Sequence, residues 1–144
     1  MGEIRVKVRL TNAVDEALSH RGDLAEENVR ACETDAMVDT GAVRSVVPAS
    51  LVHQLGLAIR GTRTAQLADG STQTVGVTGP LLFEMQARET LEEALVIGDE
   101  VLIGQTVLEK LDLLADCTCQ RLLPAHAEGP ISKVKRFAGE MFRM

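Results

Sequence analysis

The sequence predicts an all-β fold with short helices, and three observations lead to this class. Apolar and charged residues alternate strictly over 4–10, which is the period of a half-buried strand. Asp69-Gly70 stands between two β-prone runs, the pattern of a tight hairpin turn. Helical spacing is confined to short segments, so helices are expected to connect strands rather than to form a layer of their own.

The elements are expected in a nearly unbroken series of strands. The polar segment 11–27, which contains Gly22-Asp23, is expected to be a loop. A helix is expected over 49–55, because Pro48 precedes it and Gly56 follows it. A second is expected over 105–111, where apolar residues recur at helical spacing. Strands are expected at 4–10, 28–32, 35–38, 46–47, 62–67, 72–77, 81–85, 93–97, 101–103, 113–115 and 120–123.

The composition changes after Pro124, so residues 1–123 are expected to form one domain and 124–144 a linker with a C-terminal amphipathic helix. One face of this helix would be apolar and the other basic. Such a helix packs on its own protein or on a second copy, or binds a membrane surface or a partner. The apolar face would hold Ile131, Val134, Phe137, Ala138, Met141 and Phe142, and the basic face Lys133, Lys135, Arg136 and Arg143.

Charge and composition exclude several classes of function. The chain has 15 Lys and Arg against 21 Asp and Glu, a net charge of −6, which argues against binding nucleic acid through its phosphates. No apolar run approaches the roughly 20 residues of a membrane span, and the first residues lack a signal-peptide core, so we expect a cytoplasmic protein. Cys117 and Cys119 have only His126 nearby, which does not make a zinc site, and we expect neither metal nor cofactor.

The segment with the clearest chemistry is Asp39-Thr40-Gly41-Ala42, which follows the apolar run 36–38. The strand would hold the carboxylate at the edge of the core, and the glycine would allow another backbone to approach closely. On its own the motif also fits an Asx-type turn that only reverses the chain.

Two further motifs accompany this one. Ala68-Asp69-Gly70-Ser71 forms the predicted hairpin, and Leu102-Ile103-Gly104 precedes a predicted helix. In this order and spacing the three motifs resemble the retropepsin-like aspartic proteases, above all small bacterial members, over about 4–124. The resemblance implies a closed, mostly β barrel that works as a symmetric homodimer and hydrolyses extended peptides as an endopeptidase.

The resemblance also implies roles for individual residues. Asp39 matches the catalytic aspartate, Thr40 the residue that braces the two loops across the dimer axis, and Gly41 a residue whose carbonyl contacts substrate, with Ala42 completing the loop. The flap that closes over the peptide would consist of Leu67, Ala68, Asp69, Gly70 and Ser71. The buttress of the active loop would consist of Leu102, Ile103 and Gly104.

The expected chemistry explains why a dimer is needed. Two carboxylates about 3 Å apart share one proton, so one can act as a base toward water and the other as an acid toward the scissile carbonyl. The sequence contains a single Asp-Thr-Gly. The second carboxylate would therefore be Asp39 of a second chain, placed opposite by two-fold symmetry.

The sequence differs from retroviral members in three places, and these differences leave other functions to consider. Val43 and Arg44 stand where acidic residues often bind the substrate backbone, Gln105 stands where an arginine is common, and the flap has the single glycine Gly70. A non-catalytic peptide-binding or assembly module is the main alternative, and cleavage only of its own linker at 124–130 is another. A magnesium nuclease is the least favoured, since it needs scattered aspartates to converge: Asp39, Asp69, Asp99, Asp112 and Asp116.

Overall fold

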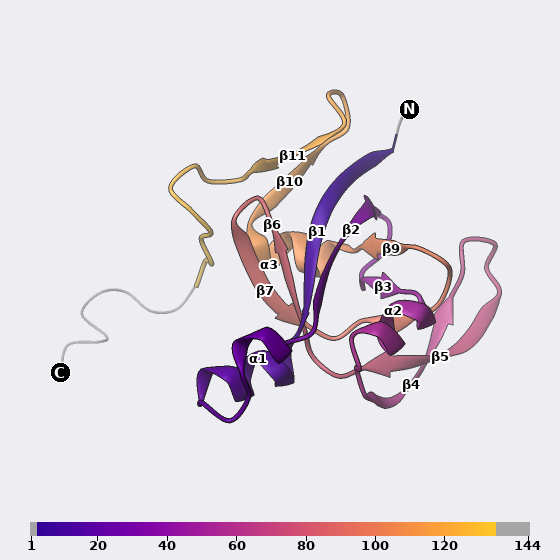
Figure 1. Ribbon diagram of the computed structural model, residues 1–144. Coiled ribbons are helices and arrows are strands. Elements are labelled where there is room, and N and C mark those ends of the chain that lie inside the picture. Colours follow the sequence, from indigo (N-terminus) through magenta and orange to yellow (C-terminus); the bar gives the residue numbers. More distant parts are fainter. Residues whose placement is uncertain (1–2, 135–144) are drawn as a thin grey trace.

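A computed structural model describes residues 3–134, and its main element is a nine-stranded sheet that curls around the core (Figure 1). The strand order is β4-β5-β8-β3-β9-β2-β1-β6-β7, and β10 and β11 form a separate two-stranded sheet. The all-β class with short helices is thus confirmed. The strands are β1 (Ile4–Asn12), β2 (Ala31–Val38), β3 (Val46–Val47), β4 (Ile59–Gln66), β5 (Thr72–Thr78), β6 (Leu81–Met85), β7 (Arg88–Glu92), β8 (Leu95–Val96), β9 (Val101–Ile103), β10 (Leu113–Asp116) and β11 (Arg121–Pro124). The helices are α1 (Ala13–His20), the 3₁₀ turn η1 (Glu26–Asn28), α2 (Ala49–Gln54) and α3 (Gln105–Leu111).

The core forms where β1, β6, β9 and α3 meet. Strand β1 pairs antiparallel with β2 on one side and with β6 on the other, so its inward side chains are enclosed from both flanks. Removing such apolar side chains from water supplies the main favourable term in folding. The largest fully buried side chains are Phe83, Leu10, Leu55, Leu81, Ile103, Leu108 and Leu111.

The segment expected to be a loop over 11–27 instead extends β1 to Asn12 and then forms α1. The side chain of Asn12 caps this helix by accepting a hydrogen bond from the Asp15 backbone N–H, at 3.0 Å. The inward-facing residue of α1 is charged: Asp15 is 5% exposed, whereas Val14 is 54% exposed. The prediction was wrong because the usual amphipathic pattern is inverted here: the buried carboxylate of Asp15 pairs at 2.8 Å with Arg30, whose side chain is half exposed.

Two strand predictions also needed correction. Instead of two strands at 28–32 and 35–38 there is one, β2, which begins only at Ala31 and pairs with β1 from Ile4↔Val38 to Thr11↔Ala31. Strand β7 was missed, because its hairpin with β6 turns through two residues with positive φ that are neither glycine nor asparagine, Gln86 and Ala87. The strand expected over 93–97 is shorter, and β8 contains two residues.

The two predicted helices are confirmed as α2 and α3, and the hairpin around Asp69-Gly70 is confirmed as the β4–β5 turn. Residues 125–134 contain neither helix nor strand. The remainder of the expected C-terminal helix, 135–144, lies outside the described residues. Within 3–134, none of the helices has the length and apolar character needed to cross a bilayer.

Candidate active site

The position of Asp39 follows from the strand that precedes it. Strand β2 is paired on both sides, antiparallel to β1 and parallel to β9, with Val38 opposite Ile103. The Asp39 backbone N–H donates to the Ile103 carbonyl oxygen at 2.9 Å, which extends this ladder by one bond. Asp39 therefore leaves the sheet at a point fixed by two neighbouring strands.

The loop after Asp39 turns tightly and orients its carboxylate. The Gly41 N–H donates to Asp39 Oδ1 at 3.1 Å, and the Ala42 N–H donates to the Asp39 carbonyl oxygen at 3.1 Å. Asp39 is half-buried, while Thr40 and Gly41 are exposed. A carboxylate held in this way by a backbone N–H keeps one oxygen engaged and the other available.

The start of α3 supports the same loop from behind. The first N–H groups of a helix have no acceptor within the helix, and here the loop carbonyls accept them. The Gln105 N–H donates to the Ala42 carbonyl oxygen at 2.8 Å, and the Thr106 N–H donates to that of Val43 at 3.0 Å. The predicted buttress 102–104 and the loop 39–42 are thus brought together by the structure.

Gly104 packs closely against the backbone that follows the loop and bonds to Ser45. A Cβ atom at Gly104 would lie 2.6 Å from both the carbonyl carbon and the oxygen of Arg44, so only glycine fits without a shift of the backbone. The Gly104 N–H donates to Ser45 Oγ at 2.9 Å, and Ser45 is fully buried. Sequence reasoning missed Ser45, because a lone serine in a loop gives no sign of a partner 59 residues away.

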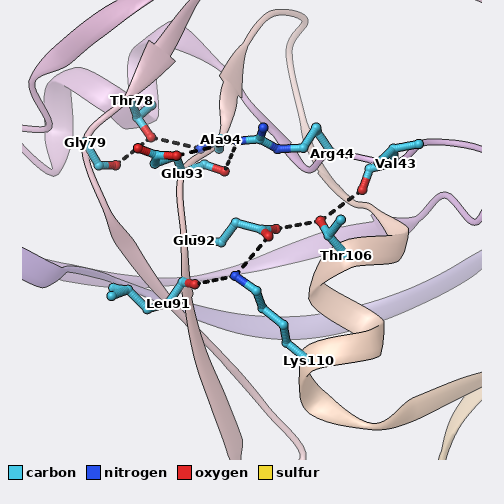
Figure 2. A network of polar contacts seen from close by, with 10 residues as sticks. All are labelled: Val43, Arg44, Thr78, Gly79, Leu91, Glu92, Glu93, Ala94, Thr106 and Lys110. Atoms are coloured by element: carbon cyan, nitrogen blue, oxygen red, sulfur yellow. Dashed lines mark hydrogen bonds and ion pairs between the residues drawn. The ribbon is translucent and has the colours of Figure 1, made fainter. Parts of the chain in front are cut away.

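A network of polar side chains continues from this loop to β7 (Figure 2). Thr106 Oγ1 lies 2.9 Å from the Val43 carbonyl oxygen and 2.7 Å from Glu92 Oε2. Lys110 Nζ lies 3.2 Å from Glu92 Oε1, and the Glu92 side chain is only 9% exposed. The network joins the loop, α3 and β7, so a shift of any one of them disturbs the other two.

The hairpin tip 67–71 is organised by its own bonds. The Leu67 N–H donates to the Ser71 carbonyl oxygen at 2.8 Å, and Gly70 takes a φ of +87°. Asp69 Oδ1 accepts from the hydroxyl of Ser71 at 2.6 Å and from its N–H at 2.9 Å, which lowers the pKa of the Asp69 carboxyl. Among the described residues, no hydrogen bond connects Leu67, Ala68, Asp69, Gly70 or Ser71 to the loop 39–42.

The scattered aspartates do not converge. Asp112 pairs with the His126 ring, which lowers the pKa of the Asp112 carboxyl, and Asp116 accepts from backbone N–H groups in the β10–β11 turn. Within residues 3–134, no three His, Cys, Asp or Glu side chains come close enough to hold a metal ion. The described part of the chain therefore lacks the carboxylate cluster that a magnesium nuclease requires.

The fold and the loop define the class as a retroviral-type aspartic protease fold, and comparison with known families agrees. Residues 27–110 match the family described as gag-polyprotein putative aspartyl protease. This match covers more than half of the 144 residues and includes the Asp39 loop, the β4–β5 hairpin and the segment 102–104. The chain belongs to this family.

The solved structures that resemble this chain are distant from it in sequence. The retroviral protease-like domain of Ddi1 from Leishmania major superposes with a TM-score of 0.55 at 12% identity, covering 95% of this chain and 99% of that one. The simian foamy virus (mac) protease gives 0.46 at 17% identity, covering 72% and 90%. The foamy viral protease-reverse transcriptase, solved with an RNA/DNA hybrid, gives 0.47 at 16% identity, covering 74% and 11%. A search of curated proteins finds no significant match.

Proposed function

We propose that this chain is an aspartic endopeptidase that acts as a symmetric homodimer, with Asp39 of each protomer forming the catalytic pair. One observation carries the proposal. The aspartate of the family motif leaves the sheet with its backbone N–H bonded to Ile103 and one carboxylate oxygen bonded to Gly41, so its position is set before any substrate binds. Such preorganisation is what acid–base catalysis by a carboxylate requires.

In the proposed reaction the two carboxylates share one proton and bind one water molecule. The ionised carboxylate takes a proton from water, whose oxygen attacks the scissile carbonyl carbon, while the protonated carboxyl donates to the carbonyl oxygen. A proton then passes to the leaving nitrogen as the C–N bond breaks. The two groups titrate as a pair, so their pKa values belong to the dimer and not to either Asp39 alone.

The remaining predicted site residues would serve this step. Thr40, Gly41 and Ala42 would line the floor of the cleft, with Leu102, Ile103 and Gly104 behind them. The hairpin tip 67–71 would close over an extended peptide through strand-like hydrogen bonds. We expect apolar side chains next to the cut bond, activity within residues 1–123, and a cytoplasmic location.

The test is cleavage of a diverse peptide library between about pH 4 and 7, because a pair that shares one proton is expected to favour acidic to near-neutral conditions. Wild type should cleave, and Asp39→Asn should not, although asparagine Oδ1 can still accept from Gly41 and should leave the fold intact. Asp23→Asn is the matched control. Asp23 is an exposed aspartate that pairs with Arg21 and lies outside the motif 39–42. A folded wild type that cleaves nothing at any pH would refute the proposal in favour of a peptide-binding module.

A mixing experiment tests the dimer. Excess Asp39→Asn protein added to wild type should form mixed dimers with a single carboxylate and so reduce cleavage far more than equal addition of Asp23→Asn protein. Specific activity should also rise with protein concentration. If the Asp39→Asn protein has no effect beyond that of the control, one chain is sufficient and the dimeric mechanism is wrong.

A further inference from the structure

A groove of about 450 Å³ lies beside the loop that carries Asp39. Its charged lining consists of three cations, Arg44, Arg60 and Lys110, and two anions, Glu92 and Glu93. The lining is therefore net positive by one charge in a chain whose total charge is −6. Because the protein as a whole repels anions, this excess of cations can act only locally.

Two of these five charges already neutralise each other. Glu92 Oε1 lies 3.2 Å from Lys110 Nζ, and Glu92 Oε2 lies 2.7 Å from the Thr106 hydroxyl. The Glu92 side chain is nearly buried, so this pair is part of the structure and is not available to a ligand. Two guanidinium groups and the carboxylate of Glu93 remain.

The hydrogen-bonding capacity of the two guanidinium groups is only partly used, and Figure 2 shows the contacts of Arg44. Arg44 Nη2 lies 3.3 Å from the Glu93 carbonyl oxygen and 3.9 Å from its carboxylate, while Arg44 Nε is buried without a partner. Arg60 makes no ion pair with any residue between 3 and 134. An arginine has five N–H donors in a planar fork that matches a carboxylate. Most of the guanidinium N–H groups in this groove therefore have no acceptor within residues 3–134.

We propose that this groove binds an acidic side chain of the peptide substrate, and that Arg44 and Arg60 determine this specificity. The inference rests on the proposed function. Glu93 is 48% exposed and its carboxylate contacts Arg44 only at long range, so a substrate carboxylate can displace it. The ligand would gain a bidentate bond to a guanidinium in a partly desolvated setting, where charge-assisted hydrogen bonds are strongest.

The chain length between the two sites limits where the acidic residue can lie. Arg44 is five residues beyond Asp39, and five residues span at most about 18 Å. An extended peptide rises about 3.3 Å per residue. The acidic side chain is therefore expected within about five residues of the scissile bond.

The experiment uses pairs of peptides that differ only by Glu or Gln at one position, for every position within that range. Wild type should cleave one Glu peptide with a kcat/KM about tenfold above that of its Gln partner, the gain of one charge-assisted bond. Arg44→Gln should remove the preference, Arg60→Gln should reduce it, and Arg44→Glu should reverse it, so that the Gln peptide is cleaved faster than its Glu partner. Arg21→Gln is the control and should keep the preference, because Arg21 is an exposed arginine at the C-terminal end of α1 and does not line the groove.

Binding of the same peptides to the Asp39→Asn protein, followed by fluorescence anisotropy, separates this inference from the proposed function. If wild type cleaves no peptide but still binds Glu peptides more tightly than Gln peptides, and this difference depends on Arg44, the peptidase proposal fails. The proposal that the groove binds an acidic side chain is then retained. Equal kcat/KM values and equal affinities for the Glu and Gln peptides overturn the inference. So does a preference that survives in both Arg44→Gln and Arg60→Gln, each confirmed as folded by thermal melting.

Discussion

Ser45→Ala should destabilise the protein, because the hydroxyl of Ser45 is the acceptor for a buried backbone group. The Gly104 N–H donates to Ser45 Oγ at 2.9 Å, and both residues are buried. Gly104 precedes α3, and an added Cβ there would meet the Arg44 backbone, so the two segments are too close for water to replace the hydroxyl. The N–H would be left without a partner.

The magnitude follows from the cost of one unsatisfied buried donor, about 1–3 kcal/mol. For a domain of this size, urea unfolding has a slope of about 2 kcal/mol per M, so the midpoint should fall by about 0.5–1.5 M. The hydroxyl itself is small, so the cavity that its removal leaves adds little to the loss in the free energy of unfolding. The loop that holds Asp39 should also loosen, because its bond to Ile103 lies next to the lost one.

The assay is urea unfolding of wild type, Ser45→Ala and Ser50→Ala at one protein concentration, since association would shift the midpoints. Ser50 is exposed on α2, so its substitution should change stability by no more than about 0.5 kcal/mol. If Ser45→Ala unfolds at the same urea concentration as Ser50→Ala, the Gly104 N–H finds another acceptor and the reasoning fails.

Two further predictions concern packing and pH. Gly104→Ala should lower the free energy of unfolding by about 1–3 kcal/mol, because the new methyl group would lie 2.6 Å from the Arg44 carbonyl. Gly79→Ala, whose nearest atom would lie 3.7 Å away, is the control, and equal urea midpoints for the two variants would contradict the steric argument. The hydrogen bond from Arg30 lowers the pKa of Asp15, so the stability from this pair should be complete above about pH 4 and be lost as the pH falls through the folded-state pKa. The difference in urea midpoint between wild type and Asp15→Asn should therefore shrink on acidification. A constant difference between about pH 7 and 2.5 would contradict the claim that ionised Asp15 stabilises the fold.

The parts of the fold that could be predicted from sequence depend on local chemistry. Helix α2 begins after Pro48 and ends before Gly56, and the β4–β5 turn contains Gly70 with a φ of +87°. In each case the residue that fixes the backbone lies within the element or next to it. Strand β9 was equally clear, since a short run of apolar residues ending in glycine fits a buried strand.

The parts that could not be predicted depend on partners far away in sequence. The residue of helix α1 that points into the protein is Asp15. A buried carboxylate is tolerated there because Arg30, 15 residues further along the chain, pairs with it. Strand β7 needs two ordinary residues in the left-handed region, a cost that the pairing of β6 with β7 must compensate. For the proposed site, the motifs indicated that the loop 39–42 and the segment 102–104 belong together, and the structure brings them into contact. Neither Ser45 nor the contact of Thr106 with Glu92 has a local signature.

The two halves of the proposed active site differ in how they are held, and this difference suits the proposed mechanism. The loop 39–42 is bonded to β9 and to the start of α3, whose Val107, Leu108 and Leu111 are almost completely buried. The position of Asp39 is therefore tied to core packing and can change only if the core changes. The tip of the β4–β5 hairpin is largely exposed, and within residues 3–134 its hydrogen bonds stay inside the tip, so it can move without disturbing the core. A fixed carboxylate and a cover that opens independently are what a peptidase needs, because the peptide must enter and leave while the catalytic pair keeps its geometry.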